Sequence, residues 1–237
     1  MRTESISYQV DGIEAVGFLA VPDGDGPRPG VLVCHEGPGQ DDHARSRATR
    51  IAEELGYVAF VLDYQGGGKP VADLGVAFAR LGELMAEPAR TRALGQAGLD
   101  LLLGAPEVDA DRVAVIGYCF GGTMALELAR TGANLKAVVG FHSGLAVGHP
   151  DDVGSIKGRV LVCLGDTDPL IPTEQRHQFE SEMLGSGVDW QMHVYGGVGH
   201  SFTNPAADSF GMPGVAFDAD ADRRSWNSML ELFAETL

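Results

Sequence analysis

The sequence predicts an α/β fold in which a mostly parallel central sheet of about seven or eight strands has helices on both faces. Apolar, β-branched segments such as residues 31–34 and 113–117 alternate along the chain with longer segments of helical periodicity. These strand segments are apolar throughout, which is typical of parallel strands buried on both faces. The 237 residues, 44% of them hydrophobic, suffice for a single domain over residues 1–237, and no repeat or change of composition divides it.

Each expected element has its own local pattern. Strands are expected over residues 6–10, 15–21, 31–34, 57–63, 113–117, 137–141, 159–164 and 190–195, as apolar or alternating runs. Helices are expected over residues 42–55, 73–86, 88–103, 120–132, 173–184 and from about 220 onward, as apolar faces at helical spacing. The remaining segments are rich in Gly, Pro and Asp and are expected as loops, among them an exposed loop over residues 142–158 and a long irregular segment over residues 196–220.

Turn and cap residues justify several of these boundaries. Asp11-Gly12 is a hairpin turn between the first two strands. Asp41 or Asp42 can cap the first helix, and Gly56 ends it. Pro88 suits the first turn of its helix. The last helix has a buried apolar face at spacings of four and three residues, formed by Trp226, Leu230 and Phe233.

Charge and composition exclude several classes of partner. The net charge of −16 and the isoelectric point near 4.6 disfavour nucleic acids and anionic membranes. The N-terminal residues are polar, unlike a signal peptide, and no apolar run reaches the length of a membrane span. We therefore expect a cytoplasmic enzyme, monomeric or homodimeric, that acts on a small molecule.

The cysteines and the glycine-rich segments predict neither a metal site nor a cofactor. Cys34 and Cys163 lie inside apolar strand segments, and the spacing of these two and Cys119 fits neither a disulfide framework nor a zinc site. Residues 66–69 read Gly-Gly-Gly-Lys but lack the spacing of a phosphate-binding loop. No cofactor is expected.

The segment Gly117-Tyr118-Cys119-Phe120-Gly121-Gly122 has the pattern of a nucleophile elbow with Cys in place of Ser. A strand must turn sharply into a helix there, and Gly117 and Gly121 remove Cβ atoms that would clash. The helix N-terminus behind Cys119 offers free N–H groups and a partial positive charge, which favour a thiolate and an oxyanion.

Four predicted strands are followed by residues capable of chemistry: Glu36, Cys119, Asp168 and His200. Ligands bind at the carboxyl ends of the strands in open α/β sheets, and the order nucleophile, acid, histidine is that of the α/β-hydrolases. We expect Cys119 to attack, His200 to transfer protons and Asp168 to orient His200, with Asp166 as a less suitable acid.

An oxyanion site needs two N–H donors. The backbone N–H of Phe120 follows the nucleophile and is expected to supply one of them. The second should come from the loop after the first buried strand, where Gly37 is best placed.

Taken together, these motifs resemble those of the dienelactone hydrolases over essentially the whole chain. The matching segments are His35-Glu36-Gly37, the elbow at residues 117–122, residues 165–172 and Gly199-His200-Ser201-Phe202. The resemblance implies an α/β-hydrolase fold and a cysteine hydrolase of esters or lactones. It also implies that Glu36 bonds the resting thiol of Cys119, which turns toward the histidine when substrate binds.

The sequence departs from this family at the site that binds the substrate carboxylate. The family has an arginine four residues after the catalytic histidine, where this chain has Asn204, and a second one before the elbow, for which Arg80 is a nearby candidate. Loss of a bidentate guanidinium favours a neutral ester or lactone and admits aryl esters and phosphotriesters as promiscuous substrates.

The substrate pocket has candidate residues near the strand ends. They are His35, Tyr118, Phe202, Asn204, Phe210 and Arg80, with Met212 and Phe217 in the irregular segment. The alternative for this segment is an ordinary packed surface loop, and the alternative for His35 and His142 is a structural role. His43, His149, His177 and His193 lack supporting context.

Two other classes of function remain open at this point. In one, the chain is a redox-sensing protein in which Cys119 is reversibly oxidised and His200 is incidental. In the other, the enzyme transfers the acyl group to an acceptor other than water.

Overall fold

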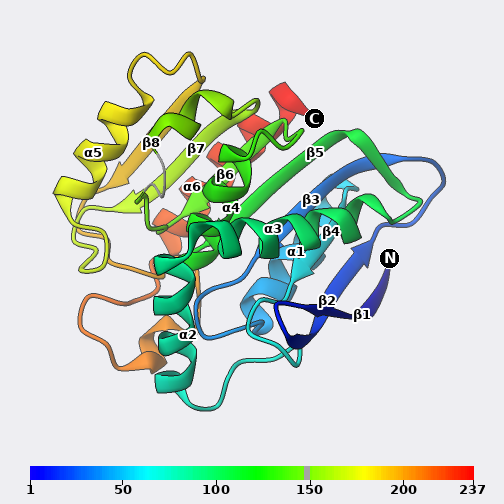
Figure 1. Cartoon of the computed structure of the whole chain (residues 1–237), viewed down its shortest axis with the longest axis horizontal. Helices are drawn as coiled ribbons and strands as arrows, with labels where there is room; N and C mark the ends of the chain where they lie inside the picture. The colour runs from blue at the N-terminus through cyan, green and yellow to red at the C-terminus, as the bar shows by residue number, and fades with distance from the viewer. Residues whose placement is uncertain (147–149) are drawn as a thin grey trace.

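The computed structural model describes residues 1–146 and 150–237; His149 and part of the loop predicted over residues 142–158 lie outside them. Eight strands form one sheet in the order β1-β2-β4-β3-β5-β6-β7-β8, with β1 and β2 antiparallel and the neighbours from β4 to β8 parallel (Figure 1). The strands are β1 (Arg2–Val10), β2 (Ile13–Val21), β3 (Arg28–Cys34), β4 (Val58–Leu62), β5 (Val108–Tyr118), β6 (Ala137–Phe141), β7 (Arg159–Gly165) and β8 (Trp190–Tyr195). The predicted α/β-hydrolase architecture is confirmed.

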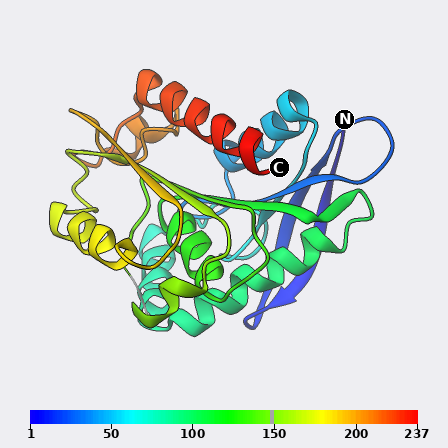
Figure 2. The ribbon, with the colours of Figure 1, turned by 90° about the horizontal axis from the view of Figure 1, so that it is seen from above.

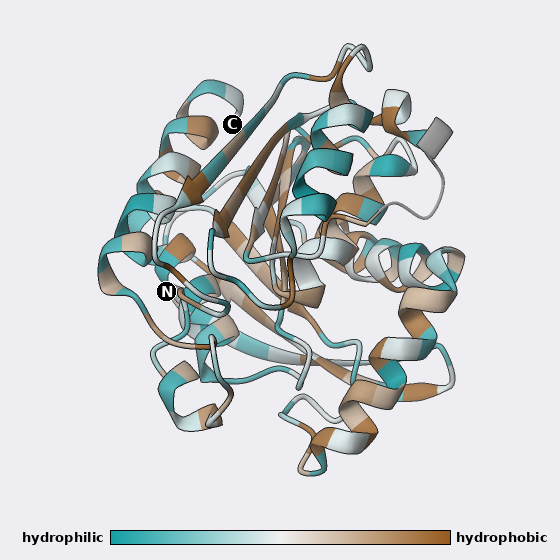
Figure 3. Ribbon diagram, turned by 90° about the vertical axis from the view of Figure 1, so that its left-hand side faces the viewer, coloured by the Kyte–Doolittle hydropathy of each residue, from teal (hydrophilic) through white to brown (hydrophobic). Residues whose placement is uncertain are grey.

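Helices cover both faces of the sheet. They are α1 (Asp42–Leu55), α2 (Leu74–Ala86), α3 (Pro88–Leu103), α4 (Phe120–Arg130), α5 (Thr173–Met183) and α6 (Ala219–Thr236), with short 3-10 helices over Pro150–Ser155 and Ala207–Phe210. One apolar core lies between the sheet and α1 with α6, and the other lies between the sheet and α2 to α5 (Figure 2). Figure 3 shows the apolar strands enclosed between helices that carry both polar and apolar residues. Among the described helices, none is both long and apolar enough to cross a membrane.

Most predicted boundaries agree with the structure, but several expectations need correction. Strand β1 begins at Arg2 rather than Ile6, and β3 begins at Arg28 rather than Val31. Strand β5 begins at Val108 rather than Val113. The segment after β6 is not simply exposed: Leu145, Val153 and Ile156 are buried, because the chain folds back over the helical face of the sheet there. In the last helix Trp226 and Phe233 are buried as predicted, while Leu230 is only partly buried.

The turn between β5 and α4 has the geometry of a nucleophile elbow. Cys119 adopts a φ of 53°, in the left-handed region that side chains other than glycine rarely occupy. Its N–H donates to the carbonyl of Phe141 at 3.0 Å, which ties the turn to the neighbouring strand β6. A Cβ atom on Gly121 would lie 2.2 Å from the carbonyl oxygen of Cys34, so the first turn of α4 packs directly against the end of β3.

We expect Gly121→Ala to lower the free energy of unfolding by at least about 2 kcal/mol, because the added methyl group must push two backbone segments apart. Urea denaturation monitored by circular dichroism measures this change. Gly82→Ala in helix α2 is the matched control, since a Cβ there meets no atom within 4 Å. The control is expected to be neutral or stabilising by up to about 1 kcal/mol. Equal stability of the two variants would contradict the close approach of α4 to β3.

Candidate active site

The side chains of His200 and Asp168 meet beyond the carboxyl ends of β8 and β7. The Nδ1 atom of His200 donates to Oδ2 of Asp168 at 2.7 Å, and Oδ1 of Asp168 accepts from the backbone N–H of Leu170 at 2.8 Å. Both side chains are buried. With Nδ1 fixed in this way, the proton that enters or leaves the imidazole in a reaction is carried by Nε2, which is buried and has no hydrogen-bond partner of its own.

The electrostatic surroundings favour the charged form of His200. Burial lowers the pKa of the ring, but the negative charge of the Cys119 thiolate and the hydrogen bond to Asp168 outweigh burial. Together they raise the pKa of His200 to about 10. The surroundings therefore favour the imidazolium form of His200 at neutral pH.

Cys119, Phe120 and His200 line one cavity of about 500 Å³, which we call the thiol cavity. Its other walls are mostly apolar and come from α2, α4 and the segment before α5; they include Phe78, Leu81, Leu84, Met85, Leu170 and Ile171. Its polar lining includes Thr91, Thr123, Glu127 and Gln175. Glu127 is bonded to Arg92 and Arg130, so its charge is compensated within the fold.

The two predicted oxyanion donors differ in their surroundings. Phe120 is the first residue of α4, so its N–H has no acceptor within the helix and lies beside the nucleophile. Gly37 lies behind the side chain of Leu81, which a Cβ on Gly37 would approach to 2.6 Å, and its carbonyl accepts from Gln65 at 2.7 Å. Oxyanion stabilisation by these two groups stays a prediction.

The carboxyl group of Glu36 is buried beside Asn204. Its Oε2 accepts from Nδ2 of Asn204 at 2.7 Å, while Oε1 is buried without a hydrogen-bond partner. Burial raises the pKa of Glu36, and the hydrogen bonds from Asn204 and Ser201 only partly oppose it. In this structure Glu36 is bonded to Asn204 rather than to the Cys119 thiol, so the bond to the resting thiol stays a prediction.

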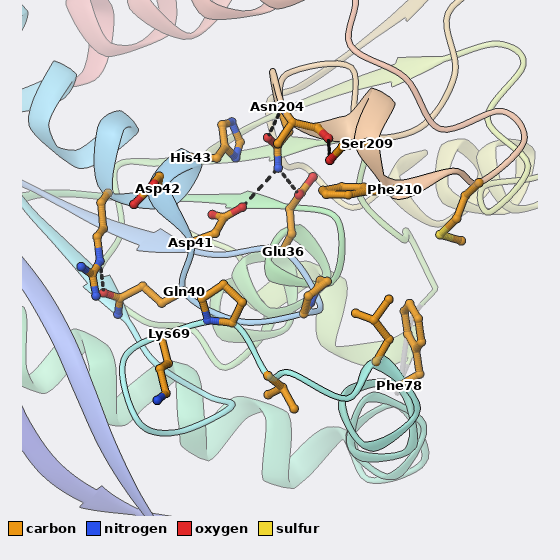
Figure 4. Close-up of a pocket in the computed structure, with 17 residues that line it drawn as sticks. Glu36, Gln40, Asp41, Asp42, His43, Lys69, Phe78, Asn204, Ser209 and Phe210 are labelled. Carbon is orange, nitrogen blue, oxygen red and sulfur yellow. Dashed lines mark hydrogen bonds between the residues drawn. The ribbon is translucent and has the colours of Figure 1, made fainter.

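Glu36 and Asn204 line a second cavity of about 600 Å³, which we call the Glu36 cavity (Figure 4). Phe210 and Met212 of the irregular segment line it too, as predicted for a substrate pocket, whereas Phe217 does not. Phe78 of α2 lines both cavities, so the two adjoin at this side chain.

Four of the predicted pocket residues lie elsewhere, and each has a structural partner. His35 stacks on Tyr64 with ring centroids 3.9 Å apart, Tyr118 stacks on Phe141, and Phe202 is part of the buried core. The guanidinium of Arg80 pairs with Asp11 and bonds the carbonyl of Tyr64. The prediction that these four residues line the pocket is therefore corrected. His35, Tyr118 and Phe202 pack against other side chains, and Arg80 forms an ion pair.

The structure also reveals functional candidates that sequence reasoning missed. Ligating atoms of Glu36, Asp41 and His43 lie within 4.8 Å of one another. The sequence contains a pattern that could have indicated this group. Asp41 and His43 lie at the start of the helix that directly follows the glycine-rich loop containing Glu36. His142, predicted as structural, packs edge-on against His200 with ring centroids 5.1 Å apart and bonds Thr203 at 2.8 Å.

Comparisons with known proteins identify the family and the fold of the chain. The sequence profile of the Dienelactone hydrolase family matches residues 15–237. The solved structure titled m3DLH is 46% identical with a TM-score of 0.95, covering 100% of this chain and 98% of that one. The dienelactone hydrolase-like promiscuous phosphotriesterase P91 from metagenomic libraries is 42% identical with a TM-score of 0.94, covering 99% and 98%. Carboxymethylenebutenolidase 2 of Cupriavidus pinatubonensis is 29% identical over 62% of this chain and 66% of its own.

The pKa of His200 leads to a prediction about pH. Because the pKa is raised from 6.5 to about 10, protonation of His200 stabilises the fold fully below pH 6.5, and this contribution disappears as the pH rises through 10. Cys119→Ala removes the thiolate, so we expect the pKa of His200 to fall in this variant. Histidine NMR titration and urea unfolding between these pH values measure both effects. A ring that titrates near 6.5 in the wild type would contradict the ion pair.

Proposed function

Because the chain belongs to the dienelactone hydrolase family, we propose that it hydrolyses an activated ester or lactone with Cys119 as the nucleophile. One observation carries the proposal: a buried pair of His200 and Asp168 next to a cysteine on a nucleophile elbow, all at one cavity. This arrangement has the three roles of a catalytic triad, which are nucleophile, proton carrier and orienting acid.

In the first half of the reaction, the Cys119 thiolate attacks the carbonyl carbon and pushes the π electrons onto the oxygen. The N–H of Phe120, with that of Gly37, stabilises the oxyanion. Collapse of the tetrahedral intermediate re-forms the carbonyl and breaks the bond to the leaving oxygen, which takes a proton from Nε2 of His200. The product of this half is a thioester on Cys119.

In the second half, neutral His200 takes a proton from water at Nε2 while the water oxygen attacks the thioester carbonyl. The second tetrahedral intermediate expels the thiolate, which pairs again with the protonated His200. Asp168 holds the ring in the same orientation throughout through its bond to Nδ1. A thiolate is a weakly basic nucleophile, so the mechanism suits enol and phenol leaving groups.

We further propose that the preferred substrates are neutral. Among its described lining residues, the thiol cavity contains neither arginine nor lysine. Arg80 pairs with Asp11, and the position of the family's other arginine is occupied by Asn204, whose amide bonds Glu36. A carboxylate entering this cavity would lose its hydration without gaining an arginine or lysine as an ionic partner.

A second activity, phosphotriester hydrolysis, is favoured by one comparison. P91, 42% identical to this chain, is described as a promiscuous phosphotriesterase. The same donors that would stabilise a carbonyl oxyanion would stabilise charge on a phosphoryl oxygen, and a neutral triester suits a cavity whose described lining has no arginine or lysine.

We expect Cys119→Ala and His200→Ala to lower kcat/KM for nitrophenyl esters by at least about 10⁴-fold, and Asp168→Asn to leave a measurable remnant. Mass spectrometry of wild-type enzyme during turnover should detect the acyl group on Cys119. Cys163→Ala, which removes a buried thiol from β7, is the matched control and should retain activity. Wild-type turnover no faster than that of Cys119→Ala would favour the redox-sensing alternative, and normal turnover by His200→Ala would refute the proton-transfer role.

We expect a neutral lactone to be hydrolysed with a kcat/KM at least about tenfold higher than the same lactone bearing a carboxylate. Arg80→Ala tests whether Arg80 binds the substrate. Because the guanidinium of Arg80 is bonded to Asp11, we expect this substitution to leave the ratio of the two kcat/KM values unchanged. Steady-state kinetics with both lactones measures the ratio. Loss of activity toward only the anionic lactone in Arg80→Ala would show that Arg80 binds the carboxylate.

A further inference from the structure

The Glu36 cavity adjoins the thiol cavity at Phe78, and two residues of its wall are linked to His200. Its wall includes Asn204, four residues after His200, and Glu36, whose carboxyl group interacts with the charge of His200. In the proposed reaction, His200 protonates the leaving group, so the leaving group must lie on its side of the scissile bond. The acyl part then faces the apolar wall of the thiol cavity, formed by Leu81, Leu84 and Ile171.

Two buried polar atoms in the wall of the Glu36 cavity lack hydrogen-bond partners. They are Oε1 of Glu36 and Nδ1 of His43, whose residues are only 3% and 6% exposed. Leaving a buried donor or acceptor unpaired costs about 1–3 kcal/mol. One ligating atom of the Glu36 carboxyl group and one of the His43 ring lie within 4.8 Å of each other, so both side chains border the same part of the cavity.

The protonation of His43 determines what it can bind. Arg47 donates from Nε to Nε2 of His43 at 3.1 Å, so the proton of the neutral ring is on Nδ1. Burial and the charge of Arg47 lower the pKa of His43 to about 3, so the ring stays neutral. Its Nδ1 is therefore a hydrogen-bond donor without a free lone pair, which suits an uncharged oxygen acceptor and disfavours a metal ion.

The charges around the Glu36 cavity disfavour an anion. Glu36, Asp41 and Asp42 bring carboxyl groups to it. Arg45 is bonded to the side chain of Gln40 and the carbonyl of Gly68, and Lys69 lies on the exposed rim. Figure 4 shows Lys69 on the opposite side of the cavity from His43 and Asn204.

We propose that the Glu36 cavity binds the leaving group of the substrate, an alcohol, enol or phenol that carries an additional uncharged carbonyl, amide or hydroxyl group. The Nδ1–H of His43 donates to the oxygen of this group, and Oε1 of Glu36 bonds its N–H or O–H. This inference rests on the proposed hydrolase function, whose substrate class it specifies.

The test compares two aryl esters with the same acyl group, one with a meta-carbamoyl phenol and one with a meta-methyl phenol. Each kcat/KM is divided by the rate of hydroxide-catalysed hydrolysis of the same ester, which removes the difference in intrinsic reactivity. We expect a carbamoyl-to-methyl ratio of about 5 to 10 for the wild type, the value of one net hydrogen bond. The normalised kcat/KM of the corresponding meta-carboxylate ester should be lower than that of the carbamoyl ester.

A matched pair of variants isolates the donor. His43→Gln keeps an acceptor for Arg47 but loses the donor at Nδ1, so its ratio should fall to about one. His43→Asn places an amide N–H near the position of Nδ1 and should retain part of the preference. If these variants do not fold, Ser209→Trp narrows the cavity from its exposed edge and should lower the ratio in the same way.

Binding of the free phenol gives a readout that does not need turnover. NMR titration should show tighter binding of meta-hydroxybenzamide than of meta-methylphenol to the wild type, and this difference should vanish in His43→Gln. Equal ratios in the wild type and His43→Gln would overturn the subsite while leaving the hydrolase function intact. Absence of ester turnover above Cys119→Ala would instead refute the proposed function. If the wild type binds Zn²⁺ tightly and His43→Gln does not, the cavity is a metal site, and the proposal of a leaving-group site is overturned.

Discussion

The close approach of the first turn of α4 to the end of β3 determines where the candidate site lies. Gly121 sits against the carbonyl of Cys34, and this contact permits only a glycine. In the same turn Cys119 has a positive φ at the N-terminus of α4, a position that favours a thiolate. The same contact brings the loop after β3, which contains Glu36 and Gly37, to the nucleophile, so one steric constraint assembles both halves of the site.

Burial and the neighbouring charges together decide which groups of the site are charged. His200 keeps its proton because a thiolate and a carboxylate face it, and its pKa is raised to about 10. His142, whose ring lies 5.1 Å from His200, has its pKa lowered by burial and by the charge of His200. His43 is neutral beside Arg47. Three histidines lie close together, but the positive charge is concentrated on His200, the one proposed to transfer protons.

The sequence was sufficient for the parts of the fold that depend on local patterns. Apolar strands, caps such as Asp41 and the order of Cys119, Asp168 and His200 follow from residue type and spacing, because parallel strands present their ends at one edge. The pocket could not be predicted in this way. Whether Arg80 faces a substrate or Asp11 depends on partners 69 residues apart that only the folded chain brings together.

Asn204 shows how one substitution changes a site without disturbing its framework. Its Nδ2 lies 2.7 Å from Oε2 of Glu36 and 3.3 Å from Oδ2 of Asp41, so a neutral amide joins two carboxyl groups. A guanidinium there could compensate a carboxylate and still attract an anionic substrate. An amide cannot, and the charge of Asp41 adds to burial in raising the pKa of Glu36. The raised pKa of Glu36 supports the proposal that this cavity hydrogen-bonds uncharged groups. The amide at Asn204, where the family resemblance implies an arginine, therefore bears on the proposed substrate rather than on the proposed reaction.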